Sequence, residues 1–421
     1  MKVTFLLLAL GISGTLAGQQ LTVEQAVSEA IAHNLDYLAR KYDLSIADAQ
    51  IITAGLRPNP VLTLDADHLD LLGTGFNTQT NNGGPTEYSV RGDYLFERGH
   101  KRQARVALAS GIRDVTRLSL VDAVRGLIQT VQDAYVDAIA AKDGLSLAQE
   151  NLQIFQNIVS INELRLKDGD VARVELLRTE VAELDFANAV RRAELQVSSN
   201  KEKLRLLLGR PQLQAFEVTG GLRHDTPALD QPEILQRAFT QRPDLQALVR
   251  DEQRAGADVR LQEANAKVDV QIGSEYRRQE ITAHANMLGF FLTAQIPVFN
   301  RNQGEILRAR QGQLQAQAQT RALRLTVEND VTLALLQYRA ARDTLEKIET
   351  TMLAKARDVR SISEYSYKRG NISLLEFLDA VRAYNDTMQS YNDARAGYAR
   401  SLDALDAATG GTTAGGKAPQ P

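Results

Sequence analysis

The sequence contains no cysteine among its 421 residues. Disulfides, thiolate metal sites and cysteine nucleophiles are therefore excluded. Its five histidines show no paired ligand spacing, its four methionines form no cluster, and neither H-E-x-x-H nor G-x-S-x-G occurs. These absences argue against a metal site, a cofactor or an enzyme active site. A net charge of -3 and a pI near 6.1 give no electrostatic basis for binding nucleic acid.

Long hydrophobic runs are missing beyond the N-terminus. The chain begins MKVTFLLLALGISGTLAGQQ, with one lysine, a short apolar run, and Thr15 and Ala17 where a signal peptidase needs small residues. This pattern predicts a secretory signal peptide over residues 1–17, with an uncleaved helical anchor as the alternative. Nothing after residue 18 approaches the roughly 18 uncharged apolar residues of a spanning helix. We therefore expect an exported protein without a transmembrane α-helix.

Proline is absent from two long stretches, between Pro85 and Pro211 and between Pro297 and Pro419. A proline inside a helix costs about 3 kcal/mol, so the two gaps predict long helices. Apolar residues recur in both gaps at spacings of 3 and 4, the pattern of helices that supercoil around neighbours. A single helix over residues 103–167 would be roughly 100 Å long. The alternative is several helices broken at glycines, namely Gly111, Gly126 and Gly144.

The chain repeats itself. RLKDGDVARVELL, from Arg165, and SYKRGNISLLEFL, from Ser366, match at an offset of 201 positions. Earlier segments match at offsets of 208, 203 and 200, as expected for copies that differ only in loop lengths. We therefore expect a first repeat over residues 18–220, a second over 221–408, and a flexible tail over 409–421.

Each copy of the matching stretch contains a Lys-x-Gly-Asp/Asn break between two helical segments. Glycine after a lysine-bearing last turn is a typical helix C-terminal stop. The two breaks are therefore predicted to be the tips of two helical hairpins, over residues 103–208 and 303–407. The tip residues are Lys167, Asp168, Gly169, Asp170, Lys368, Arg369, Gly370 and Asn371.

Four segments alternate between apolar and polar residues, over about 60–69, 86–97, 268–277 and 286–298, although Phe291 interrupts the pattern of the fourth. Period 2 and a length near ten residues suit membrane-spanning β-strands, with a soluble, half-buried sheet as the alternative. The Asn/Gly-rich GTGFNTQTNNGGP between the first two segments is predicted to be an outer loop. Four strands cannot close a barrel in lipid, so if these segments span a membrane, several chains must contribute to one barrel.

The signal peptide, GLRPNP before the first strand, PVFNRNQGEI after the fourth and YKRGNISLLEFLDA at the second tip resemble the TolC-like outer-membrane efflux protein family. The similarity covers about residues 21–408. In that family three chains form a 12-stranded outer-membrane β-barrel that continues into a periplasmic α-helical barrel. The resemblance implies a mainly α fold class with a small membrane β part, two tandem repeats, long antiparallel coiled-coil helices and four strands per chain.

The resemblance also implies a function and partners. The chain would be the exit duct of a tripartite efflux system in a Gram-negative outer membrane, a homotrimer in contact with outer-membrane lipid and with a large periplasmic part. Its partners would be a periplasmic adaptor and an inner-membrane pump, for which the RND type is one candidate; the substrate stays open. Many family members carry an N-terminal lipid on a cysteine, and this chain is expected to lack that anchor. A secreted or periplasmic coiled-coil scaffold or adaptor without a membrane barrel is the alternative.

The family closes its tunnel with acidic residues just past the second turn. Aligned through LLEFLDA, that pair corresponds to Glu376 and Asp379, and the tyrosine that helps to hold the tip shut corresponds to Tyr367. Positions three apart share a helix face, so the two carboxylates can point together. The first repeat has Glu175 and Arg178 instead. The alternative is that both acidic residues are solvated helix residues without a role in the pore.

Overall fold

The computed structural model describes residues 19–69, 71, 86–212, 215–227, 229–280 and 285–411. The predicted signal peptide, the Asn/Gly-rich outer loop and the last ten residues of the tail lie outside these ranges. The elements of the first repeat are β1 (Gln19–Leu21), α1 (Val23–His33), α2 (Leu35–Gly55), β2 (Val61–Asp67), β3 (Thr86–Phe96), α3 (Lys101–Asp168) and α4 (Arg173–Leu207). Those of the second are β4 (Phe216–Val218), α5 (Gln231–Gln241), α6 (Pro243–Asn265), β5 (Val270–Glu280), β6 (Ala285–Ala294), α7 (Gln303–Lys347), the π-helix η1 (Ile348–Met352), α8 (Leu353–Lys368) and α9 (Leu374–Thr409). By the order of its elements this series begins with β4, just before residue 221, where the second repeat was expected to begin.

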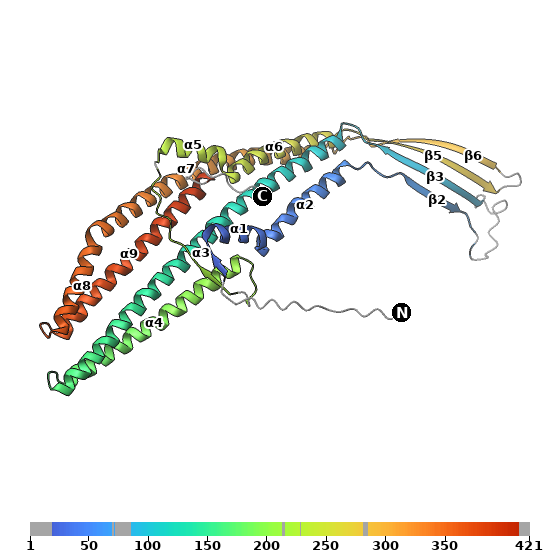
Figure 1. Ribbon diagram of the computed structural model, residues 1–421. Coiled ribbons are helices and arrows are strands. Elements are labelled where there is room, and N and C mark those ends of the chain that lie inside the picture. The colour runs from blue at the N-terminus through green and yellow to red at the C-terminus, as the bar shows by residue number, and fades with distance from the viewer. Residues whose placement is uncertain are drawn as a thin grey trace, which may run out of the picture. The chain divides into compact units, whose positions relative to one another are not determined.

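Both repeats follow the same order: a short strand, two helices, two longer strands and a long helical hairpin. Figure 1 shows α4 folding back along α3, and α9 folding back along α8. The predicted fold class is confirmed, because the chain is mainly helical, with two equivalent hairpins and one sheet of four strands.

The helix α3 is continuous over 68 residues. It passes through Gly111, Gly126 and Gly144 without a break, so the alternative of several shorter helices is wrong. A glycine inside a helix costs only about 1 kcal/mol relative to alanine, which contacts along so long a helix readily offset.

The second repeat differs from the first by the π-helix between α7 and α8. Upstream of it, AAKDGL and AARDTL match at an offset of 200, whereas the tips downstream match at 201. One residue added to an α-helix would turn everything beyond it by about 100°. A π-turn inserted in the helix absorbs such a residue locally. The copies therefore differ by a residue inside a helix as well as in their loop lengths.

The four longer strands form one antiparallel sheet in the order β2-β3-β5-β6. The register places Leu64 opposite Val90, Val90 opposite Tyr276, and Tyr276 opposite Leu288, so these side chains share one face. Large apolar side chains exposed on that face are Leu62, Leu64, Tyr88, Val90, Phe96, Ile272, Tyr276, Leu288, Phe290 and Leu292. An exposed apolar surface of this extent requires a covering, either another protein surface or lipid.

The opposite face of the sheet is polar and linked by ion pairs. Arg91 contacts Asp93 at 2.8 Å, and Arg277 contacts Glu275 at 2.8 Å and Glu87 at 2.7 Å. Phe291, which interrupts the alternation of the fourth strand, lies on this face under the guanidinium of Arg91, 4.1 Å from the ring centroid. The cation covers the aromatic ring, so one face of the sheet stays apolar and the other polar.

Two compact units share the described residues of the chain. One contains the described residues within 19–39, 121–242 and 327–411, and the other contains those within 40–120 and 243–326. Each unit takes equivalent parts of both repeats: the first holds the hairpin tips and the second holds the sheet of four strands. No helix in the part of the chain that the structure describes combines the length and the apolar content needed to cross a bilayer.

The first unit has a core at its short parallel sheet. β1 and β4 pair in parallel, and Leu21 and Val218 are buried against α1, α3 and α4. The hydroxyl of Tyr135 on α3 hydrogen bonds the carbonyl oxygens of Leu21, at 3.1 Å, and Thr219. The short strands β1 and β4, with which the two repeats begin, are therefore both linked to α3 through the side chain of Tyr135.

Candidate functional site at the hairpin tips

The two hairpins end in the same backbone turn. Gly169 and Gly370 have φ values of +82° and +76°, in the left-handed region that glycine adopts without strain. In each turn the next residue donates its N–H to a carbonyl of the preceding helix, at 2.8 Å in the first hairpin and 2.9 Å in the second, as in a Schellman motif. The donor and acceptor pairs are Asp170 with Arg165 and Asn371 with Ser366. Both pairs are 201 positions apart, so the repeat extends to individual hydrogen bonds.

The eight predicted tip residues are all exposed. Lys368 contacts Glu364 at 2.7 Å, and the guanidinium of Arg369 lies 4.5 Å from the ring centroid of Tyr365. A Cβ added to Gly169 would meet no atom within 4 Å, and one added to Gly370 would meet only the guanidinium of Arg165, at 3.9 Å. The turns are therefore open surfaces whose glycines are required by backbone conformation and not by packing.

Arg165 joins the two tips. It belongs to the last turn of α3, and its guanidinium donates to the backbone carbonyl of Lys368 at 2.6 Å and to that of Tyr367 at 3.4 Å. The last carbonyls of a helix lack intrahelical donors and carry the negative end of the helix dipole. The guanidinium of Arg165, from the first hairpin, therefore hydrogen bonds the free carbonyl groups at the C-terminal end of α8, in the second hairpin.

Tyr367 lies between the hairpins. Its side chain is 4% exposed, and its ring stacks on Phe377 at 5.4 Å between centroids. The phenolic oxygen accepts a hydrogen bond from Asn162 at 2.8 Å and donates to Glu175 at 3.5 Å. Burial raises the pKa of Tyr367, so the phenol stays neutral. Tyr367, the residue predicted to hold the tip shut, does join both hairpins. It is buried, whereas the carboxylates of Glu376 and Asp379 are exposed.

Glu376 occupies the third position of α9 and closes a capping box. Its carboxylate accepts from the backbone N–H of Ser373 at 2.7 Å and from its hydroxyl at 2.9 Å, and Ser373 accepts from the N–H of Glu376 at 3.3 Å. These hydrogen bonds lower the pKa of Glu376 and keep it ionised. In the first repeat Ala172 stands at the capping position and makes no such bond.

Asp379 lies one turn further along α9 and is exposed. Its nearest cation is Arg382, at 3.4 Å on the same helix, and both side chains are largely in solvent. An exposed ion pair of this kind is worth less than about 1 kcal/mol, so it leaves the carboxylate free to interact with other charges. The structure thus places Glu376 and Asp379 on exposed positions of the first two turns of α9.

Two residues that matter for the tip were not singled out from the sequence, Asn162 and Arg165. Asn162 is fully buried, and it continues the 3-and-4 spacing of Phe155 and Ile158. A polar residue in such an apolar series commonly specifies how helices pair. Among the described residues, no group of three or more His, Asp or Glu could hold a metal ion.

A sheet with one exposed apolar face, together with long helical hairpins that end in open turns, suits the subunit of a membrane channel. The model of the outer membrane efflux protein family matches residues 26–210 and 234–411. The chain belongs to this family. It is accordingly an outer-membrane efflux channel, the exit duct of a tripartite system, and its four strands fit the trimeric 12-stranded barrel of that fold.

Known relatives agree in sequence and in fold. The cobalt-zinc-cadmium resistance protein CzcC of Cupriavidus metallidurans is 26% identical over 372 residues, which cover 87% of this chain and 84% of CzcC. The outer-membrane channel CmeC of Campylobacter jejuni superposes with a TM-score of 0.75 at 15% identity, covering 92% of this chain and 85% of CmeC. A membrane protein from Pseudomonas aeruginosa gives a TM-score of 0.76 at 17% identity, covering 93% and 90%.

Proposed function

We propose that three copies of this chain form the duct, with the sheet in the outer membrane and the hairpin tips in the periplasm. The observation that carries this proposal is the sheet of four strands with one exposed apolar face. Every backbone group in lipid must be paired, and a barrel made by one chain needs about eight strands or more. Three copies supply 12 strands, and the apolar face then contacts outer-membrane lipid.

The partners follow from this arrangement. A duct that ends in the periplasm receives its substrate through a periplasmic adaptor and an inner-membrane pump, for which the RND type is one candidate. The tips offer two exposed, glycine-containing turns per chain and therefore six in a trimer. Bare backbone at Gly169 and Gly370 allows helices of the adaptor to approach closely. The tips are the docking end of the duct.

The narrowest point of the duct is set by Glu376 and Asp379. Both are exposed near the start of α9, and three copies would bring six carboxylates around one axis. Glu376 is fixed by its capping box, and Asp379 has only an exposed arginine beside it. Carboxylates crowded at a constriction attract cations, and their charges act through a lower effective dielectric than on an open surface. Tyr367 contributes by holding α8 against the first hairpin.

The substrate is a divalent metal cation. Two observations support this class: the likeness to a cobalt-zinc-cadmium resistance protein, and the charge of the polar face of the sheet. Five carboxylates and two guanidinium groups of the four strands share that face: Asp65, Asp67, Glu87, Asp93, Glu275, Arg91 and Arg277. Deleting the gene should make the host more sensitive to metals. The highest concentration of zinc, cobalt or cadmium salt at which it still grows should fall. Unchanged tolerance to all three metals would refute the assignment.

Membrane fractionation tests the function itself against a soluble scaffold. A barrel protein stays with the outer membrane after alkaline carbonate extraction, and the purified protein forms channels in planar bilayers. A coiled-coil scaffold, the other candidate for long helical hairpins, is released by carbonate and forms no channels. Release of this chain by carbonate would overturn the proposed duct.

A further inference from the structure

A cleft that the channel function does not use lies on the first compact unit. It is bounded by α1, α3, α9 and residues 221–225 after β4, and its volume is about 660 Å³. All the residues that line this α1 cleft belong to that one unit. Pockets of roughly 300–1,000 Å³ with mostly apolar walls and a few polar groups are the usual form of small-molecule sites. The α1 cleft has the size of such a site.

Much of the wall of the α1 cleft is apolar. Val23, Val27 and Ile31 follow one another at intervals of four along α1, so they share one face of that helix. The rest of the apolar wall comes from α3, α9 and the segment after β4, with Ile128, Val136, Ala399 and Leu222. Most of these side chains are only half-buried. Covering their free surface with an apolar body would therefore be favourable.

The charges of the α1 cleft centre on Arg223. Its guanidinium donates to Asp403 at 2.8 Å, to Asp406 at 2.7 Å and to Asp225 at 3.0 Å. Glu24 on α1 adds a fourth carboxylate to the lining. With four carboxylates and one guanidinium, the lining is strongly negative when all five groups are ionised. A cleft with charges of one sign and apolar walls concentrates ions of the opposite sign, here cations.

Asp403 has an oxygen without a partner. Its side chain is 3% exposed, and its Oδ1 accepts the hydrogen bond from Arg223. Its Oδ2 accepts no hydrogen bond from any residue that the structure describes. Burial raises the pKa of Asp403 to about 6, as expected of a carboxylate that has lost much of its hydration. A donor bound in the α1 cleft would replace part of that hydration.

We propose that the α1 cleft binds a hydrophobic amine, that is, a protonated ammonium group carried on an apolar ring or chain. The ammonium group donates to Asp403, and the apolar body covers the face of α1 that carries Val27 and Ile31. A bare metal ion does not suit the cleft, because no group of His, Asp and Glu among the described residues could hold one. The amine is a ligand of the protein and not its transported substrate, so the inference does not depend on the proposed duct.

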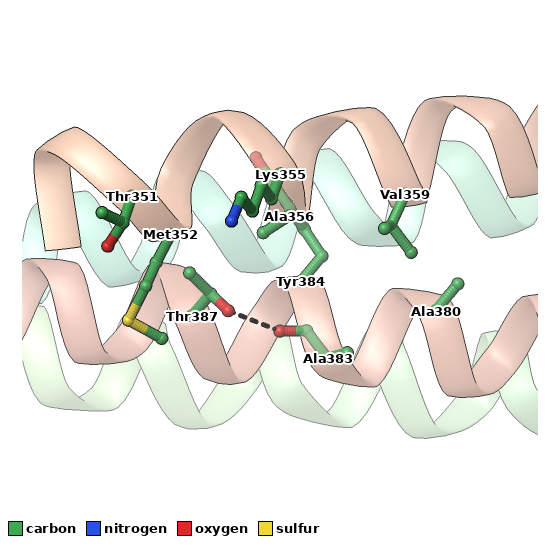
Figure 2. A pocket seen from close by; sticks show the side chains of 9 residues that line it. All are labelled: Thr351, Met352, Lys355, Ala356, Val359, Ala380, Ala383, Tyr384 and Thr387. Carbon is green, nitrogen blue, oxygen red and sulfur yellow. Dashed lines mark hydrogen bonds between the residues drawn. The ribbon is translucent and has the colours of Figure 1, made fainter.

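A second groove, between α8 and α9, differs from the α1 cleft in charge. Its volume is about 350 Å³, and Lys355 is the one charged residue in its lining. Figure 2 shows this α8 groove with its other lining side chains, among them Ala380 and Ala383. An amine would meet a like charge there. A hydrophobic amine should therefore bind in the α1 cleft and not in the α8 groove.

Three naphthalene probes of different charge test the class of ligand: naphthylmethylamine, the neutral naphthalenemethanol and the anion naphthylacetate. Equilibrium dialysis measures their binding to the full chain in lipid nanodiscs, with empty nanodiscs as the blank. The amine should saturate and should bind about tenfold more tightly than the alcohol, because it forms a hydrogen bond to a charged group. Equal affinities of amine and alcohol, or no saturable binding of the amine, would overturn the proposal.

Two substitutions separate the charge of the α1 cleft from its space. Asp403→Asn removes the carboxylate, so the amine should lose most of its advantage over the alcohol. Ser28 is exposed on α1 and lines the cleft, so Ser28→Trp should fill the space and weaken the binding of both probes. The matched control is Ala383→Trp, which fills the α8 groove and should leave both affinities unchanged. If the two tryptophan variants behave alike, the amine does not occupy the α1 cleft.

Photolabelling of the wild-type chain tests the site without any substitution. A naphthylmethylamine that carries a diazirine should label peptides from residues 23–31 and 399–406 on irradiation. Excess naphthylmethylamine should prevent this labelling, and excess naphthalenemethanol should prevent it much less. Labelling confined to the α8 groove, or equal protection by the two competitors, would contradict the proposal even where a variant fails to fold.

Discussion

The phenolic oxygen of Tyr367 accepts a hydrogen bond from Asn162 at 2.8 Å, and this bond ties the end of α8 to α3. The guanidinium of Arg165 strengthens the same junction through the carbonyls of Tyr367 and Lys368. The second hairpin can therefore separate from the first only by breaking hydrogen bonds at a buried phenol. Opening of the periplasmic end should depend on these groups.

Replacing Tyr367 by phenylalanine keeps the ring on Phe377 and removes the hydroxyl. The amide of Asn162 then loses a buried partner, which should lower the free energy of unfolding by about 1–3 kcal/mol. The loosened junction should also raise single-channel conductance in planar bilayers. Tyr365→Phe is the matched control, because that ring is exposed. Equal conductance of the Tyr367 and Tyr365 variants would show that the phenol does not hold the tip.

Replacing Glu376 and Asp379 together by alanine should raise conductance and weaken block by a trivalent cation. The reason is the loss of six carboxylates at the constriction of the trimer. Because Glu376 also caps α9, the control is Ser373→Ala, which costs roughly 1 kcal/mol of helix stability and keeps both carboxylates. If Ser373→Ala changes cation block as much as the double variant does, the effect is structural and the assignment of the constriction is wrong.

Bulky substitutions at the tip glycines should abolish efflux and preserve the trimer. The φ of Gly370 is +76°, which asparagine tolerates and a β-branched residue does not. Gly370→Asn therefore adds a side chain with little backbone strain, whereas Gly370→Val adds a side chain and also strains the backbone. Loss of efflux in both variants, measured by accumulation of zinc, cobalt or cadmium in the cells, supports docking at this turn. Full efflux in Gly370→Asn would place the adaptor elsewhere.

The stability of the first unit should depend on pH through Asp403. This carboxyl group on α9 is buried, and burial raises its pKa to about 6 even though Arg223 lies 2.8 Å away. In the unfolded chain the group loses its proton near pH 4, so the folded state binds the proton more tightly and loses stability as pH rises from about 4 to 6. The loss is on the order of 3 kcal/mol. The variant Asp403→Asn should not show this loss when its free energy of unfolding is measured at pH 4.5 and at pH 7.5. If the variant and the wild-type protein both lose the same amount between the two pH values, Asp403 is not the source of the loss.

Much of the architecture was predictable because it depends on local patterns. The Lys-x-Gly turns at Gly169 and Gly370 stop helices for reasons of backbone conformation alone, and the alternating strands carry their faces in their own residues. Proline-free stretches and offsets near 201 sufficed to predict two equivalent hairpins. These features need no knowledge of contacts between distant parts of the chain.

Some features could not be predicted because they depend on contacts between distant parts of the chain. Others have a trace in the sequence that was not recognised. The hydrogen bonds of Arg165 and Asn162 to the second hairpin arise only once the hairpins lie together. The π-helix has a local trace, the change of offset from 200 to 201 within a helix. Ser373 and Glu376 also form the S-x-x-E pattern of a capping box, a local signal that was not singled out from the sequence. The carboxylate of Glu376 is held in place by hydrogen bonds from the backbone N–H and the hydroxyl of Ser373.

The number of chains in the purified protein tests the central claim most directly. Four strands per chain with one apolar face require partners to close a barrel, and three copies are expected. Native mass spectrometry of protein extracted from the outer membrane in mild detergent should therefore give three times the mass of the mature chain. A stable monomer in the same detergent would contradict the account, because a sheet of four strands could not then span the membrane.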